Sequence, residues 1–139
     1  MRPVIKGYIS CPNILIFHAG GNDIGTYTLG AISLEIDRLF GFFTHTFPKT
    51  TIVFSEILYR KKYRHNNNFS SMESVRKQSN KKASTYAKNH GGFIIKHRNI
   101  NQNTNSFPDD DPVHLNDIGN EVFIQNIYEG LCNIIAHDK

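Results

Sequence analysis

The sequence predicts an α/β protein with three layers, in which helices cover both faces of a parallel sheet. Three short apolar segments have the β-branched and aromatic composition of buried strands, and they span residues 13–18, 51–55 and 93–97. Each is followed by a longer segment in which apolar residues recur at helical spacing. Strands that alternate with helices in this way pair in parallel, because each helix carries the chain back across the sheet.

The first strand, residues 13–18, is apolar at successive positions, so we expect both of its faces to be buried. A turn made of Gly20, Gly21, Asn22 and Asp23 ends it. The helix that follows is predicted by a single apolar stripe, which is formed by Leu29, Ile32, Ile36, Leu39 and Phe43.

The second strand, residues 51–55, leads into a basic and Asn-rich stretch, residues 60–71, which we interpret as a surface loop. The next helix has an apolar stripe formed by Met72, Val75, Ser79, Ala83 and Tyr86. Gly91 and Gly92 should end this helix, because glycine readily adopts the left-handed conformation found at helix C-termini. The basic residues of the helix are expected to face water: Arg76, Lys77, Lys81, Lys82 and Lys88.

The third strand, residues 93–97, is followed by a polar and irregular segment, residues 99–110. Asn116 can cap a last helix, because its side chain can accept a hydrogen bond from a free backbone N–H group of the first turn. The apolar stripe of this helix is formed by Val122, Phe123, Ile127, Leu131 and Ile134.

The composition is that of one ordinary globular domain, with 139 residues of which 39% are apolar. The net charge of +4 is mild and does not by itself indicate binding to nucleic acid. No apolar run reaches the length of a membrane span, and Pro12 interrupts the apolar stretch that a signal peptide would need. We therefore expect a cytoplasmic protein in which Cys11 and Cys132 are ordinary thiols.

Two polar clusters follow strands, at the edge where parallel sheets gather functional groups. The first contains Gly20, Gly21, Asn22 and Asp23, which on their own are more typical of a tight turn than of a site. No Gly-Lys-Ser/Thr follows, so this turn does not have the pattern of a phosphate-binding loop.

The second cluster places Asp111 three residues before His114. A carboxylate at this spacing can turn back onto the imidazole, accept a hydrogen bond from one ring nitrogen and leave the other free as a base. On its own the pattern is more typical of an acidic loop, residues 109–111, beside an unrelated histidine. A metal site is not indicated, because no second ligand has a supporting spacing.

Taken together, the two clusters resemble the third and fifth blocks of the SGNH (GDSL-type) hydrolases, in which Gly-x-Asn-Asp follows a strand and Asp-x-x-His precedes the final helix. The surrounding sequence is similar to the SGNH domains of vertebrate retroelement-derived proteins, from about Cys11 to Ile135. The similar segments are His18-Ala19-Gly20-Gly21-Asn22-Asp23-Ile24-Gly25, Ser55-Glu56-Ile57, Gly91-Gly92 with Lys96-His97-Arg98, and Val113-His114-Leu115-Asn116-Asp117-Ile118-Gly119.

The resemblance implies a flavodoxin-like αβα fold and the hydrolysis of a small acyl ester without a cofactor or a metal. It implies that His114 is the general base, that Asp111 orients it, and that the Asn22 amide donates to the oxyanion. Gly20 and Gly21 would let the backbone approach the substrate carbonyl. Acyl transfer requires these groups, because a base must reach a hydroxyl and donors must face the developing negative oxygen.

The nucleophile is the part of the family pattern that this sequence does not show. In the family it is a serine in a Gly-Asp-Ser-like block, upstream of the Gly-x-Asn-Asp block. Ser10 has no preceding glycine and comes before a strand, whereas Ser55 ends a different strand from the one that carries the family's nucleophile. We therefore expect a partial SGNH-type domain over residues 1–139, truncated to about three strands, with a poorly defined segment at residues 1–12.

Three functions remain open from the sequence. The chain could be an ester hydrolase without its serine, a non-catalytic remnant that binds a protein partner, or a module associated with nucleic acid. The last is the least favoured, because the basic residues of the second helix are most simply a solvated face. We also expect residues 13–18 to have an unpaired edge through which the chain self-associates.

Overall fold

The computed structural model describes residues 11–63 and 66–137, so Ser10 and most of the segment 1–12 lie outside the described residues. The strands are β1 (Ile14–His18), β2 (Thr51–Ser55) and β3 (Phe93–Ile95). The helices are α1 (Leu29–Thr46), α2 (Phe69–Asn89) and α3 (Asp117–His137), with a short 3₁₀ helix, η1 (Gly21–Asp23), between β1 and α1.

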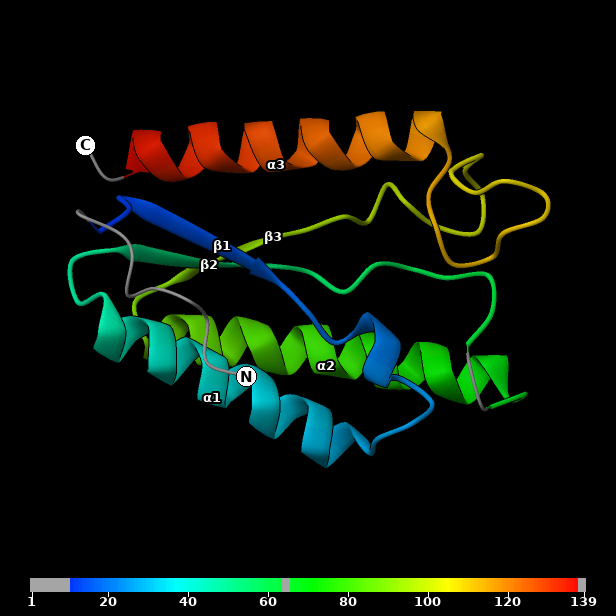
Figure 1. The fold of residues 1–139 in the computed structure, drawn as a ribbon, viewed down its shortest axis with the longest axis horizontal. Coiled ribbons are helices and arrows are strands. Elements are labelled where there is room, and N and C mark those ends of the chain that lie inside the picture. Colours follow the sequence, from blue (N-terminus) through cyan, green and yellow to red (C-terminus); the bar gives the residue numbers. More distant parts are fainter. Residues whose placement is uncertain (1–10, 64–65, 138–139) are drawn as a thin grey trace.

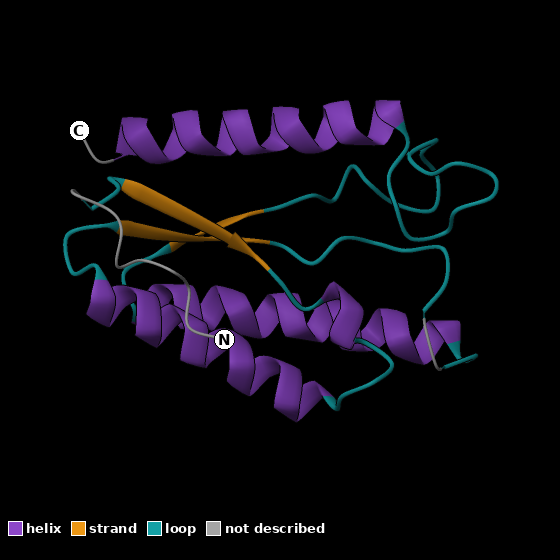
Figure 2. Ribbon diagram, in the orientation of Figure 1, coloured by secondary structure: helices purple, strands orange, loops and turns teal. Residues whose placement is uncertain are grey.

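The three strands form one parallel sheet in the order β1-β2-β3. Helices α1 and α2 cover one face of the sheet and α3 covers the other, so the molecule has three layers (Figures 1 and 2). The predicted fold class, an α/β fold with a parallel sheet between helices, is confirmed.

β3 is shorter than the predicted strand, since it ends at Ile95 and not at residue 97. The Glu56 backbone N–H, just beyond β2, donates to the Ile95 carbonyl at 2.9 Å, which is the last ladder bond. The next backbone N–H on this side, that of His97, turns to the Glu56 carboxylate, with an N···Oε1 distance of 3.4 Å. The Glu56 side chain thus takes the place of a backbone carbonyl of the neighbouring strand as the acceptor, and the ladder of backbone hydrogen bonds ends there.

The core lies mainly between the sheet and the helices α1 and α2. Phe17 of β1, Phe40 of α1 and Phe54 of β2 pack with ring centroids 5.0–6.3 Å apart. Phe40 is fully buried although the predicted stripe of α1 does not include it, whereas Leu39 is only partly buried. A smaller cluster on the opposite face contains Val53, Ile95 and Ile134.

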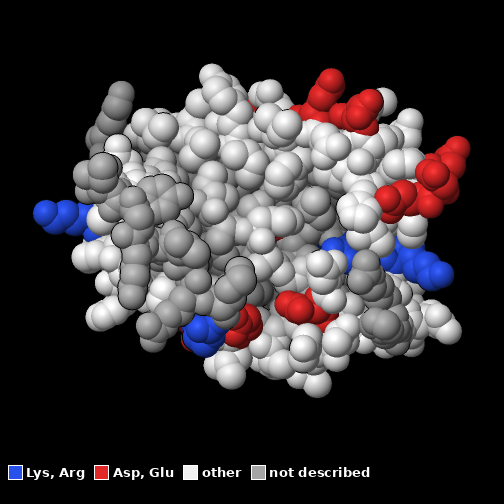
Figure 3. Space-filling view, in the orientation of Figure 1, with Lys and Arg blue, Asp and Glu red and all other residues white. Residues whose placement is uncertain are grey.

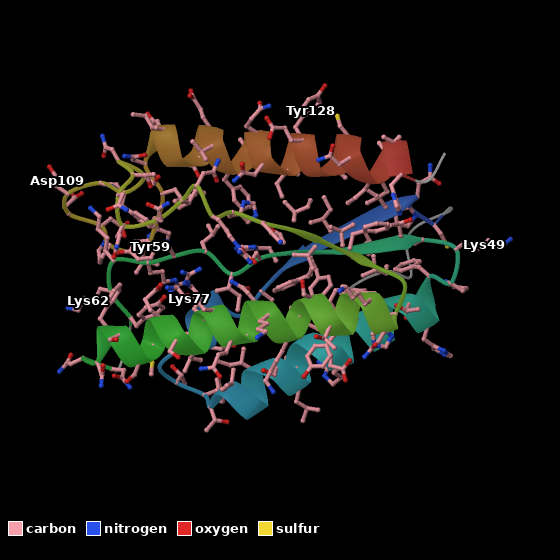
Figure 4. All side chains as sticks on the ribbon, turned by 180° about the vertical axis from the view of Figure 1, so that it is seen from behind. Lys49, Tyr59, Lys62, Lys77, Asp109 and Tyr128 are labelled. Carbon is pink, nitrogen blue, oxygen red and sulfur yellow. The ribbon has the colours of Figure 1, made fainter. Side chains whose placement is uncertain are left out.

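α3 is the least buried of the three helices. Asn116 caps it as predicted, because its Oδ1 accepts a hydrogen bond from the Gly119 N–H at 2.7 Å. Of its predicted stripe only Ile134 is buried, and Tyr128 points away from the sheet (Figure 4). In the part of the chain that the structure describes, no helix combines the length and the apolar character needed to cross a membrane.

Replacing two helical glycines by alanine is expected to have opposite effects on stability. A Cβ atom at Gly119 would lie 2.3 Å from the Ser106 carbonyl oxygen, whereas one at Gly41 would meet only the His90 ring at 3.8 Å. We expect Gly119→Ala to lower the free energy of unfolding by about 2 kcal/mol, because backbone must move. Gly41→Ala should raise it by about 0.5–1 kcal/mol through helix propensity. Urea denaturation followed by circular dichroism measures both, and equal effects would contradict the packing at Gly119.

Candidate active site

The loops that follow the three strands meet at one end of the molecule, beyond the carboxyl ends of the sheet (Figure 1). Acidic and basic side chains gather together at this end of the surface (Figure 3). Tyr59, Lys62 and Asp109, from the loops after β2 and β3, lie at the same end (Figure 4). Both predicted polar clusters belong to these loops.

Asp111 and His114 are hydrogen-bonded to each other, with 2.8 Å between Asp111 Oδ2 and His114 Nδ1. The other carboxylate oxygen, Oδ1, accepts the backbone N–H groups of Val113 and His114, each at 2.9 Å. These hydrogen bonds lower the pKa of Asp111 to about 2. The His114 N–H has the largest effect, followed by the Val113 N–H and then the imidazole. The carboxylate is therefore ionised at neutral pH.

An ionised carboxylate can only accept hydrogen bonds, so the His114 nitrogen that faces it, Nδ1, carries a proton. In the tautomer with its single proton on Nδ1, the lone pair of the second ring nitrogen, Nε2, can accept a proton. The His114 side chain is 78% exposed, so a reacting group can approach it from solvent. The structure thus brings Asp111 and His114 together in the arrangement of a base and its orienting carboxylate.

The other predicted cluster forms a tight turn directly after β1. Gly20 has a φ of 103°, a conformation that only glycine adopts without strain, and the chain then enters η1. Asn22 is exposed, and its Oδ1 accepts a hydrogen bond from Arg60 Nη2 at 2.9 Å. The amide group of Asn22 is therefore held by one polar contact and not by packing.

The loop after β2 connects the two clusters. Arg60 bonds to Asn22, and the backbone N–H of the next residue, Lys61, donates to the Pro112 carbonyl at 2.9 Å. Pro112 lies inside the Asp111–His114 turn. Asn22 and His114 thus lie at the same edge of the sheet, and one short segment contacts the loops that carry both.

Ser55, which ends β2, is not placed to react with His114. It is fully buried, with Oγ at 2.7 Å from His97 Nε2 and at 3.1 Å from His18 Nδ1. The Phe123 ring stacks on the 3% exposed His97 at a centroid distance of 4.6 Å. Among residues 11–63 and 66–137, no serine hydroxyl is hydrogen-bonded to His114.

The network around Ser55 ties the ends of the sheet to α3. His97 follows β3, and its Nδ1 lies 3.1 Å from the Asn126 amide nitrogen of α3, while Asn126 also pairs with Asn99. Burial, and then the nearby His18, lower the pKa of His97 to about 4. Partial burial of its ring is also the main cause of the lowered pKa of His18. Both rings are therefore neutral at pH 7 and serve as polar packing groups.

No role was predicted from the sequence for Arg60, His97 or Asn126. Arg60 falls in the stretch interpreted as a surface loop, and Asn126 lies off the apolar stripe of its helix. The segments around Ser55 and His97 are among those that resemble the SGNH family, and this similarity was the one sign in the sequence that they matter. Similarity of a segment does not predict which side chains are in contact. No three His, Cys, Asp or Glu side chains of the described ranges are placed to hold a metal ion.

Comparison with known proteins finds a solved structure with the same fold. No protein-family model and no curated protein matches the sequence. A solved structure of a GDSL-like lipase from Bacteroides thetaiotaomicron is similar over 88% of this chain, with a TM-score of 0.72 and 15% sequence identity. The chain spans 63% of the length of that lipase. At this level of identity the likeness establishes a shared fold, and it agrees with the SGNH (GDSL-type) resemblance of the sequence.

Proposed function

We propose that this chain carries the general base, its orienting carboxylate and an oxyanion donor of an SGNH-type hydrolase of small acyl esters, akin to the SGNH domains of vertebrate retroelement-derived proteins. The observation that supports this most directly is the hydrogen bond between Asp111 and the exposed His114, at the sheet edge that also holds Asn22. The fold shared with a GDSL-like lipase agrees with the same proposal.

In the proposed reaction a serine hydroxyl attacks the ester carbonyl while His114 Nε2 takes up its proton. Asp111 stabilises the resulting imidazolium, and Asn22 Nδ2 with the backbone at Gly20 and Gly21 donates to the tetrahedral oxyanion. His114 then returns the proton to the leaving alcohol. Water cleaves the acyl-serine by the same route and releases the acid. The serine comes from a Gly-Asp-Ser-like block, as in the resembled family.

The 139-residue chain alone is expected to be a poor esterase, because no described serine contacts His114. We expect it to hydrolyse p-nitrophenyl acetate no faster than its His114→Ala variant. A fluorophosphonate probe should label no serine, including the buried Ser55. Stoichiometric labelling of one serine, identified by peptide mass spectrometry, would show that the nucleophile lies within the chain.

A gain-of-activity experiment tests the proposal itself. A strand–turn–helix segment that carries the Gly-Asp-Ser block of an active family member is fused ahead of residue 11. We expect the chimera to hydrolyse p-nitrophenyl acetate with a burst of one p-nitrophenol per chain, and Asn22→Ala to reduce kcat by about 10²–10³-fold through loss of an oxyanion donor.

Two controls decide the outcome of that experiment. Replacing the introduced serine with alanine, or making His114→Ala, should abolish the burst. The proposal would be contradicted by a chimera that is folded and monomeric but inactive, or by one whose activity is unchanged in His114→Ala.

A further inference from the structure

An asparagine can act as an oxyanion donor in only one of the two orientations of its amide group. Nδ2 must face the substrate, because Oδ1 in its place would repel the developing negative charge. The two orientations have nearly the same shape, so packing selects between them poorly. Asn22 is also exposed, which leaves few neighbouring atoms to make the selection. A polar partner must therefore fix the orientation.

Arg60 has the chemistry to do this. Its Nη2 lies 2.9 Å from Asn22 Oδ1, and a guanidinium carries only donors. The amide atom that faces it must therefore be the oxygen. Because Oδ1 and Nδ2 are the two branches of one planar group, Nδ2 is turned away from Arg60, and no described residue accepts a hydrogen bond from it.

The Gly20–Asn22 turn fits closely against the segment that carries Arg60. A Cβ atom at Gly21 would lie 2.7 Å from Arg60 Nη2 and 3.4 Å from its Cζ, so the guanidinium packs directly on the Gly21 backbone. A Cβ atom at Gly20 would lie 2.9 Å from Ile57 Cδ1. The absence of both side chains lets the turn approach the segment closely enough for the Arg60–Asn22 bond.

The segment itself is anchored to the rest of the fold. The Asn80 side chain of α2 accepts from the Ile57 N–H at 2.9 Å and donates to the Ile57 carbonyl at 3.1 Å. Four residues later, the Lys61 N–H donates to the Pro112 carbonyl at 2.9 Å. Arg60 thus extends from a segment fixed at one end by α2 and bonded at the other to the turn that carries His114.

We propose that Arg60 is a positioning residue that holds the Asn22 amide with its nitrogen toward the substrate, and that Gly21 leaves the room in which the guanidinium lies. The effect of this orientation on catalysis rests on the proposed esterase function, whereas the contact between Arg60 and Asn22 does not. Arg60 acts through Asn22 and does not touch the reacting atoms.

Nuclear magnetic resonance of the ¹⁵N-labelled full chain tests the contact without any activity. The two Nδ2 protons of Asn22 give a pair of cross-peaks, identified by its disappearance in Asn22→Ala. We expect the pair to shift in Arg60→Met, because the amide loses its charged donor. Arg60→Lys should return the pair most of the way to the wild-type position, since an ammonium group also carries only donors.

Two further variants separate this contact from general effects. Lys62→Met removes the same charge from the same loop and should leave the Asn22 pair in place. Gly21→Ala keeps the arginine but displaces its guanidinium, so it should shift the pair as Arg60→Met does. Circular dichroism establishes that each variant is folded. An Asn22 pair that stays in place in folded Arg60→Met, or that shifts equally in Lys62→Met, would overturn the proposal.

The active chimera provides a kinetic readout that a merely structural role would not give. There, Arg60→Met should reduce kcat by about tenfold with KM unchanged, because only the transition state carries the oxyanion. Arg60→Lys should restore most of the loss. The chimera can lack esterase activity while the Asn22 cross-peaks still shift when Arg60 is replaced. That result would refute the esterase function and leave the orienting role of Arg60 in place. Full kcat in Arg60→Met would overturn that role.

Discussion

Acidification from pH 7 to pH 4 is expected to lower the free energy of unfolding by about 3 kcal/mol through His97 alone, whose pKa falls from 6.5 to about 4 in the fold. Between these two values the unfolded chain binds a proton that the folded chain excludes. Stability should therefore decrease as the pH falls below 6.5 and level off, for this group, below about 4. Urea denaturation at half-unit steps of pH measures the slope.

The physical cause is the position of His97, which is 3% exposed between Phe123 and Ser55. A charged ring there would lose its hydration, and the neighbouring His18 would oppose it further. His18 also has a lowered pKa and adds to the slope in the same direction. The Asp111 carboxylate acts in a separate and lower window, between its ordinary pKa of 3.8 and about 2.

Two variants test whether the buried His97 ring causes the dependence of the unfolding free energy on pH. His97→Gln should be less stable than the wild type at pH 7, where it loses the contact with Ser55, but should show a much flatter dependence between pH 6.5 and pH 4. His45→Gln replaces an exposed histidine of α1 and should keep the wild-type slope. An undiminished slope in His97→Gln would mean that other groups cause the acid sensitivity.

Local patterns in the sequence were enough to predict the fold. The strands at residues 13–18 and 51–55 are continuous apolar runs, and each is bounded by a turn or a polar residue, so both were predicted almost to the residue. The third strand was predicted too long, because its end depends on Glu56, a side chain that follows a different strand. Contacts between distant segments decide such ends, and a local pattern does not contain them.

The same distinction applies to the candidate site. The pairing of Asp111 with His114 is local, so their three-residue spacing predicted a contact that the structure contains. The Arg60–Asn22 bond joins residues 38 apart in sequence, and the Ser55–His97 bond joins residues 42 apart. Neither contact can be predicted from the spacing of residues along the chain. Arg60 also lies in a basic stretch that has the composition of a solvated loop, so nothing in its surroundings marked it as part of a site.

β1 is the element that we expect to drive self-association of the purified chain. In the described part of the chain it has a strand partner on one side only, because the sheet order is β1-β2-β3. Its residues Ile14, Leu15 and Ile16 are all partly exposed and carry no charge. An apolar strand with open backbone groups pairs readily with a second copy. We propose that two chains join through β1 and that their sheets become continuous.

The ladder identifies which residues of β1 face that second copy. The Thr51 N–H donates to the Asn13 carbonyl, and Ile14 is paired with Thr51. In a parallel ladder, alternate residues then turn their backbone groups toward the neighbour, so Leu15 faces β2 and Ile16 faces outward. Ile16→Pro therefore removes a donor from the open edge, whereas Leu15→Pro removes one from the ladder itself.

We expect the apparent mass from light scattering after size exclusion to rise with concentration for the wild-type chain. It should stay near that of a monomer for Ile16→Pro, with the helical circular dichroism signal retained. Leu15→Pro is the matched control and should unfold, because it breaks the pairing of β1 with β2. A wild-type chain that is monomeric and melts cooperatively at every concentration would contradict the proposal, since an open apolar edge cannot then be available on β1.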